Sequence, residues 1–275
     1  MLGKRILSGI IGGLLAIGVI YEGNWLFFIA IILLTMWGWR EYIRLVRHIS
    51  VNVPILFGYG WLLLFLGSVW FSQIQCTILL GAILVYWSLL RPIFFHNKIK
   101  FVDSAYAFMG LVYVAFGFTA MLALRCSSLG IHLGLDQVPF GVDSTRVIMF
   151  LLIFSTWASD TCAFFVGKYW GTHKLCVAIS PGKTKEGIIG GCIGTIVVAM
   201  IVAVVGQIPV IHGFLIGIII AVMAPLGDLI ESVLKRTCGV KDSGTLIPGH
   251  GGVLDRFDSL LVAAPMVLLY VYIVT

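Results

Sequence analysis

Most of this chain consists of long apolar runs joined by short polar connections, and these runs restrict the possible folds more than any other feature. About nine runs are long enough to cross a bilayer core, at roughly 5–21, 24–39, 54–71, 76–91, 104–124, 146–167, 187–206, 210–234 and 256–274. Only 11% of the residues are charged, against about 25% in soluble domains. Backbone groups in hydrocarbon must be hydrogen-bonded internally, and runs of this length do so as helices. The sequence predicts an all-α, polytopic integral membrane protein with about nine transmembrane helices.

Basic residues predict the orientation of these helices. If the N-terminus is cytoplasmic, all but Arg125 and Arg146 of the 18 lysines and arginines fall on the cytoplasmic side, as the positive-inside rule requires. We expect the basic run 40–48 to lie along the inner leaflet. The missing N-terminal soluble extension suggests a bacterial plasma (inner) membrane. We expect residues 1–145 to supply five lipid-facing packing helices, and residues 146–275 to form the catalytic region with cytoplasmic loops.

The segment 224–259 concentrates charge in this otherwise apolar chain. It holds five of the twelve acidic residues, namely Asp228, Glu231, Asp242, Asp255 and Asp258. An ionisable group at membrane depth costs several kcal/mol, on the order of 3 or more, unless it is paired or lines a polar cavity. We therefore interpret this segment as the working site, on the cytoplasmic side.

Helical spacing groups the charges at the end of the run 210–234. Asp228, Glu231, Ser232 and Lys235 are three, four and seven residues apart, so they share one helix face. Asp255 and Asp258 are one turn apart at the start of the last helix, where carboxylates could simply complement the helix dipole. Their clustering with Asp228 instead indicates a hard cation, and Mg²⁺ takes one or two carboxylates together with substrate phosphates.

Between these two helices lies a glycine-rich connection with basic neighbours. Lys241 and Asp242 begin it, and Gly251 and Gly252 follow His250, so the backbone can approach a ligand closely. A flexible turn would have the same glycines. However, cations surround this one: Lys235, Arg236, Lys241 and Arg256. Cations, backbone donors and a metal are what phosphoryl or nucleotidyl transfer needs.

Two further residues are candidates for the same site. Asp160 is the lone carboxylate of the run 146–167, in the triplet Ser159-Asp160-Thr161. It is either a site residue or a packing partner of a basic side chain. Lys183 lies in Ser180-Pro181-Gly182-Lys183-Thr184, which resembles a phosphate loop but lacks the P-loop spacing and a preceding strand. It either binds a phosphate or is an ordinary cytoplasmic lysine.

The run from Ser232 to Asp258 closely resembles the signature of the phosphatidate cytidylyltransferases, or CDP-diacylglycerol synthases. That signature reads S-x-x-K-R, then K-D-x-G, then P-x-H-G-G-x-x-D-R-x-D, and every fixed position is filled here. Motifs similar to those of the family extend over roughly 155–260. The first 145 residues resemble the family only in length and hydropathy. Cys162 and Lys185 depart from its pattern without removing a charged group.

The resemblance implies transfer of CMP from CTP to phosphatidic acid, giving CDP-diacylglycerol and pyrophosphate. It implies a Mg²⁺ centre held by Asp228 and Asp255, with room for a potassium ion, in a homodimer without a nucleic-acid partner. The catalytic residues would be Asp228, Ser232, Lys235, Arg236, Asp255 and Asp258. The phosphates and nucleotide would contact Asp160, Lys183, Lys241, Asp242, His250, Gly251, Gly252 and Arg256.

Three other functions compete with this one. A cation- or proton-coupled transporter also uses intramembrane acids, but no inverted repeat is evident and the acids cluster at one face rather than at the midplane. A CDP-alcohol phosphotransferase would show a D-G-x-x-A-R start, which is absent. A purely structural subunit would not explain the charge cluster.

Overall fold

The computed structural model describes residues 2–96, 98–125, 143–176, 179–244 and 251–274, with side chains from residue 9 onwards. Nearly all of this part of the chain is helical, in line with its apolar composition. The helices are α1 (Leu2–Glu22), α2 (Asn24–Arg47), α3 (Ile55–Trp70), α4 (Ile74–Phe94), α5 (Phe101–Arg125), α6 (Ser144–Trp170), α7 (Lys185–Val205), α8 (Val210–Thr237) and α9 (Leu254–Val274).

The all-α membrane architecture predicted from the sequence is confirmed. Within the described ranges, seven helices are long and apolar enough to cross a membrane, while α3 and the stretch of α1 whose side chains are described (Gly9–Glu22) are shorter apolar segments. One expectation was wrong. The basic run 40–48 does not form a separate segment along the leaflet, because α2 continues to Arg47 and buries Tyr42, Leu45 and Val46 against its neighbours.

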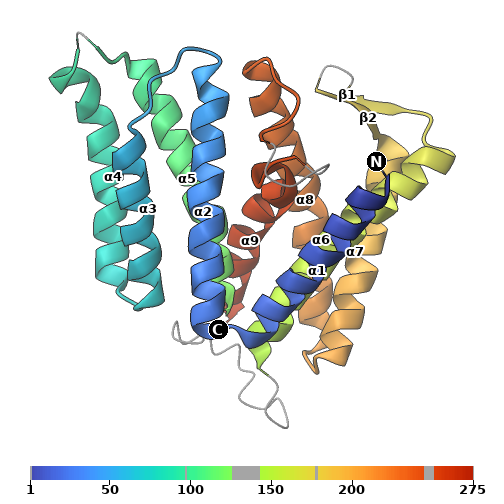
Figure 1. Cartoon of the computed structure of the whole chain (residues 1–275). Coiled ribbons are helices and arrows are strands. Elements are labelled where there is room, and N and C mark those ends of the chain that lie inside the picture. The colour runs from blue at the N-terminus through green and yellow to red at the C-terminus, as the bar shows by residue number, and fades with distance from the viewer. Residues whose placement is uncertain (1, 97, 126–142, 177–178, 245–250, 275) are drawn as a thin grey trace.

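The helices form two groups that meet along α5 and α9 (Figure 1). In one group α6, α7, α8 and α9 pack in succession, and in the other α2, α3 and α4 surround α5. Helix α1 lies across α6. Small residues allow the close approach between the groups, because a Cβ on Gly117 of α5 would lie 2.6 Å from the Cα of Leu261 in α9.

A β-hairpin connects α6 to α7 at the end of the bundle where α1 begins (Figure 1). Its strands β1 (Lys174–Cys176) and β2 (Ser180–Thr184) are antiparallel. Glu186, in the first turn of α7, accepts hydrogen bonds from the backbone N–H groups of Thr172 and His173. The side chain of Thr184 caps α7 by accepting the Gly187 N–H at 3.1 Å. These bonds fix the hairpin to the two helices that it joins.

The opposite end of the bundle is held by a clasp of Arg125, Asp143 and Thr145. The buried Arg125 guanidinium donates to the carbonyl of Ile20 at 2.8 Å and to Thr145 Oγ1 at 3.1 Å. It also pairs with the Asp143 carboxylate at 3.0 Å, and that carboxylate caps α6. The clasp thus joins α1, α5 and α6.

A proline interrupts the hydrogen bonding of α8 just before its charged end. Pro225 has no N–H, so the carbonyl of Ala221, four residues earlier, lacks its usual helical donor. The thiol of Cys192 in α7 donates to this carbonyl, with a sulfur–oxygen distance of 3.4 Å. The side chain of a neighbouring helix therefore compensates for the missing bond.

Candidate active site

A cavity of about 800 Å³ opens between α6, α7, α8, α9 and the hairpin. Its wall is partly apolar, with Phe164 and Ile188, and otherwise strongly charged. The charged lining includes these residues of the predicted site: Asp160, Lys183, Asp228, Lys235, Asp242, Asp255, Arg256 and Asp258. The fold therefore brings together residues that are up to about a hundred positions apart in the sequence.

Three helices each direct a carboxylate at this cavity. Asp160 of α6, Asp228 of α8 and Asp258 of α9 line it and interact electrostatically with one another. Lys183, on β2, reaches in from the hairpin and pairs with Asp228 at 2.7 Å. The lysine of the loop that resembles a phosphate loop thus lies beside the acidic cluster.

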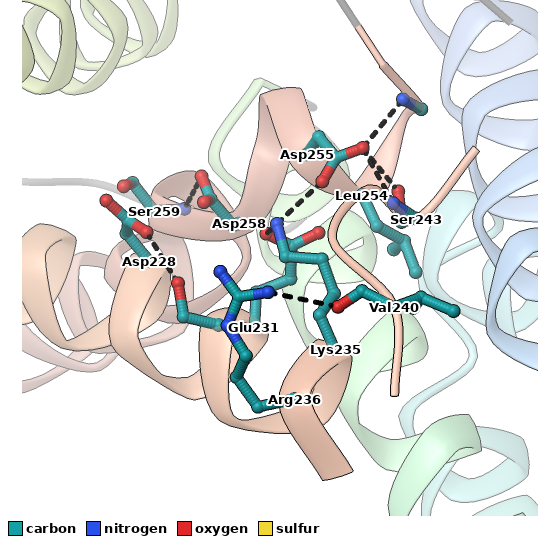
Figure 2. Close-up of polar contacts among 12 residues, drawn as sticks. Asp228, Glu231, Lys235, Arg236, Val240, Ser243, Leu254, Asp255, Asp258 and Ser259 are labelled. Carbon is teal, nitrogen blue, oxygen red and sulfur yellow. Dashed lines mark hydrogen bonds and ion pairs between the residues drawn. The ribbon is translucent and has the colours of Figure 1, made fainter. Parts of the chain in front are cut away.

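Lys235 forms the centre of a second, more buried set of ion pairs. Figure 2 shows its amine pointing between Glu231 and Asp255. The distances are 2.6 Å to Glu231, whose side chain is fully buried, and 2.7 Å to Asp255. The other Asp255 oxygen accepts the Ser243 and Gly252 N–H groups at 2.9 and 2.8 Å. This carboxylate therefore joins α8, α9 and the connection between them.

The two carboxylates that the resemblance assigns to metal differ in their surroundings. Asp228 is about a third exposed, whereas Asp255 is 7% exposed and hydrogen-bonded at both oxygens. Among the described residues no three metal-ligating side chains converge into a ready-made cage. Mg²⁺ does not need one, since it usually binds through one or two carboxylates, waters and substrate phosphates.

The other described residues of the predicted site are not among the residues that line the cavity. Ser232 donates to Asp228 at 3.3 Å. Arg236 is exposed and donates to the carbonyls of Val240 and Ile179, which ties α8 to the hairpin. Lys241 is also exposed. The two glycines Gly251 and Gly252 precede α9, while His250 lies outside the described residues.

Gly251 and Gly252 have a structural reason to be glycine. Gly251 has a φ of +85°, which glycine adopts at little cost, and a Cβ there would lie 2.6 Å from the Asp255 carboxylate. A Cβ on Gly252 would lie 2.4 Å from Ser243 Oγ. The connection can fold tightly around Asp255 only because these side chains are missing.

One buried acid at this site was missed by the sequence analysis. Glu41 of α2 is 1% exposed, and its carboxylate accepts the N–H groups of Val253 and Leu254, each at 2.9 Å. A signal was available, because Glu41 is the lone carboxylate within α2, just as Asp160 is in its own run. It was overlooked because the surrounding arginines suggested a surface segment.

Apolar helices that enclose a cavity lined with lysines and carboxylates define a polytopic membrane protein with a site for a charged ligand. The chain matches the model of the cytidylyltransferase family over residues 3–274 and belongs to that family. It is 34% identical to the phosphatidate cytidylyltransferase of Synechocystis sp., over 98% of this chain and 96% of the relative. It is 33% identical to that of Bacillus subtilis, over 95% and 94%. No observation supports the transporter interpretation.

Proposed function

We propose that this chain transfers CMP from CTP to phosphatidic acid and releases pyrophosphate, forming CDP-diacylglycerol in the membrane. The observation that carries the proposal is the cavity itself, where Lys183, Lys235 and Arg256 face a carboxylate cluster beside an apolar wall. Such a lining suits a triphosphate and the phosphate of a lipid together. Both relatives named above are phosphatidate cytidylyltransferases, which agrees with this choice of substrates.

The reaction needs positioning and charge neutralisation more than acid–base chemistry. An oxygen of the lipid phosphate forms a bond to the α-phosphorus of CTP, and the bond from that phosphorus to the bridging oxygen breaks as pyrophosphate leaves. A phosphomonoester is already ionised near neutral pH, so no general base is required. Lys183 and Arg256 would hold phosphate oxygens and stabilise charge on the departing pyrophosphate.

Mg²⁺ fits the donors of this cavity. Clustered carboxylates repel one another unless a cation is present, and carboxylate oxygens are the ligands that Mg²⁺ prefers. We propose Asp228 and Asp255 as its ligands, with potassium as a second possible ion. When bound, the metal would neutralise charge on the phosphates. Lys183 would then exchange its contact with Asp228 for one with the nucleotide.

The surroundings of the enzyme follow from the same proposal. We infer a bacterial plasma (inner) membrane, with the cavity on the cytoplasmic side where CTP is found. The distribution of lysine and arginine supports this orientation. We also infer a homodimer, as the family resemblance implies, with CTP, phosphatidic acid and membrane lipid as the other partners.

Pyrophosphate release by purified protein in detergent tests the proposed reaction. Phosphatidic acid, CTP and Mg²⁺ are each omitted in turn, and we expect release only when all three are present. Asp228→Asn and Asp255→Asn should each abolish turnover, while Glu22→Gln, at an exposed acid in α1, should not. Folded protein that releases no pyrophosphate would refute the proposal, and near-full activity of either asparagine variant would refute the metal assignment.

A further inference from the structure

Glu41 of α2 accepts hydrogen bonds from backbone N–H groups at the start of α9. The first N–H groups of any helix lack partners within the helix. Here the Glu41 carboxylate accepts those of Val253 and Leu254, where α9 begins. A negative charge at this position is also favoured by the helix dipole. The acid thus joins α2, in the N-terminal half of the chain, to the charged segment near the C-terminus.

Glu41 and Asp255 hold the same backbone from two sides. Asp255 accepts the N–H groups of Ser243 and Gly252. Glu41 accepts those of Val253 and Leu254, the two residues that follow Gly252. The Ser243 hydroxyl lies 2.9 Å from Asp255 Oδ2 and 3.4 Å from Glu41 Oε2. A hydroxyl has one proton, so it donates to the nearer carboxylate. The position of Asp255 therefore depends on backbone that Glu41 fixes.

Two glycines of the connection make room for the Glu41 carboxylate. A Cβ on Gly244 would lie 2.5 Å from Glu41 Oε1, and its three nearest atoms would all belong to Glu41. A Cβ on Gly252 would lie 2.5 Å from Glu41 Oε2. Gly244 is not among the glycines with a positive φ, so no left-handed conformation requires glycine at this position. Glu41 thus explains why a side chain at residue 244 is excluded.

We propose that Glu41 is a positioning residue for the reaction. It is not among the described residues that line the cavity, and it acts through α9 and the connection to hold Asp255 and the Lys235 amine. This inference rests on the proposed function for its effect on turnover. Its structural part, the contact between Glu41 and the start of α9, does not depend on which reaction occurs.

Glu41→Gln keeps the shape of the side chain but replaces one accepting oxygen with an NH₂ group that faces N–H donors. We expect kcat per folded molecule to fall by about 100-fold, as a displacement of about 1 Å at a reacting centre can do. KM for CTP and for phosphatidic acid should stay within about twofold, because cavity contacts carry ground-state binding. Glu22→Gln is the matched control and should leave both constants unchanged. Retention of kcat in Glu41→Gln would overturn the proposal.

A second variant tests the same contact without altering Glu41. Gly244→Ala should lower kcat in the otherwise native protein, because the new methyl group displaces the carboxylate. Combined with Glu41→Ala, it should cause no further loss, whereas independent sites would multiply their losses. Gly60→Ala, where a Cβ meets open space, is the control. If the loss of kcat in the double variant equals the product of the losses in the two single variants, the proposal is overturned.

Hydrogen exchange tests the role of Glu41 independently of whether the proposed reaction occurs. In Glu41→Gln the amides of Val253 and Leu254 should exchange faster than in the native protein, while amides of α3 stay unchanged. Unchanged exchange at Val253 and Leu254 would overturn the role of Glu41 even if the enzyme is active. Native protein that releases no pyrophosphate would refute the reaction, and faster exchange would still support the Glu41 contact.

Discussion

Replacing Lys235 should destabilise the protein far more than replacing an ordinary lysine. Its side chain is 13% exposed and pairs with both Glu231 and Asp255. Lys235→Met would leave two buried carboxylates without their shared cation. Breaking a buried ion pair in this way costs about 3–5 kcal/mol, and the complete burial of Glu231 favours the upper part of that range.

SDS titration of the purified protein in mixed micelles, followed by tryptophan fluorescence, measures this loss. Lys235→Met combined with Glu231→Gln should recover much of the free energy of unfolding, because the more buried charge is then removed too. Lys98→Met, at an exposed lysine, should stay within about 0.5 kcal/mol of the native protein. A loss below about 1 kcal/mol in Lys235→Met, the value for exposed pairs, would refute the reasoning.

Three further perturbations test other parts of the molecule. Lys183→Met removes the amine beside Asp228, and pyrophosphate release should show KM for CTP rising about tenfold, since hydrogen bonds to charged groups contribute about 1.5–3 kcal/mol. Gly227→Ala would place a Cβ 2.5 Å from the Asp258 carbonyl oxygen, and overpacking should cost about 1–3 kcal/mol in the SDS titration. Burial raises the pKa of Asp143, but hydrogen bonding and nearby arginines lower it more. The clasp should therefore contribute fully to the free energy of unfolding at pH values above the ordinary aspartate pKa. This contribution should be lost as the pH falls through the lowered pKa of Asp143.

Each of these predictions has a matched control. Lys185→Met changes an exposed lysine beside the hairpin and should not alter KM; an equal rise in both variants would indicate general electrostatics. Gly67→Ala adds a Cβ in open space, so an equal loss there would contradict the packing argument. In Asp143→Asn the free energy of unfolding should fall less on acidification than in the native protein. If its pH dependence is unchanged, another group is responsible for the acid sensitivity.

The helices could be predicted from the sequence because hydropathy alone identifies them. The end of α2 could not, because Arg40 and Arg44 mark a membrane interface in most sequences, while the helix here continues with Tyr42 buried. The β-hairpin was also missed. Its second strand, Ser180–Thr184, contains proline and glycine, so its pairing depends on the helices at either end.

Contacts at the site were predictable where helical spacing determines them. Glu231 and Lys235 are four residues apart on one helix, and they pair as that spacing requires. The pairing of Lys183 with Asp228 joins two elements whose relative placement no local pattern fixes. The contact of Glu41 with Leu254 spans 213 positions, and only the packing of α2 and α5 against α9 brings these residues together.

The thiol that replaces the missing helical donor in α8 has a practical consequence for labelling experiments. Spectroscopic probes are usually attached to a background from which every native cysteine has been removed. Here alanine at Cys192 would leave the carbonyl of Ala221 without that donor, one turn before Pro225 and two turns before Asp228. Serine keeps a donor of similar size at this position. A labelling background with serine at residue 192 should therefore preserve the geometry of α8 better than one with alanine.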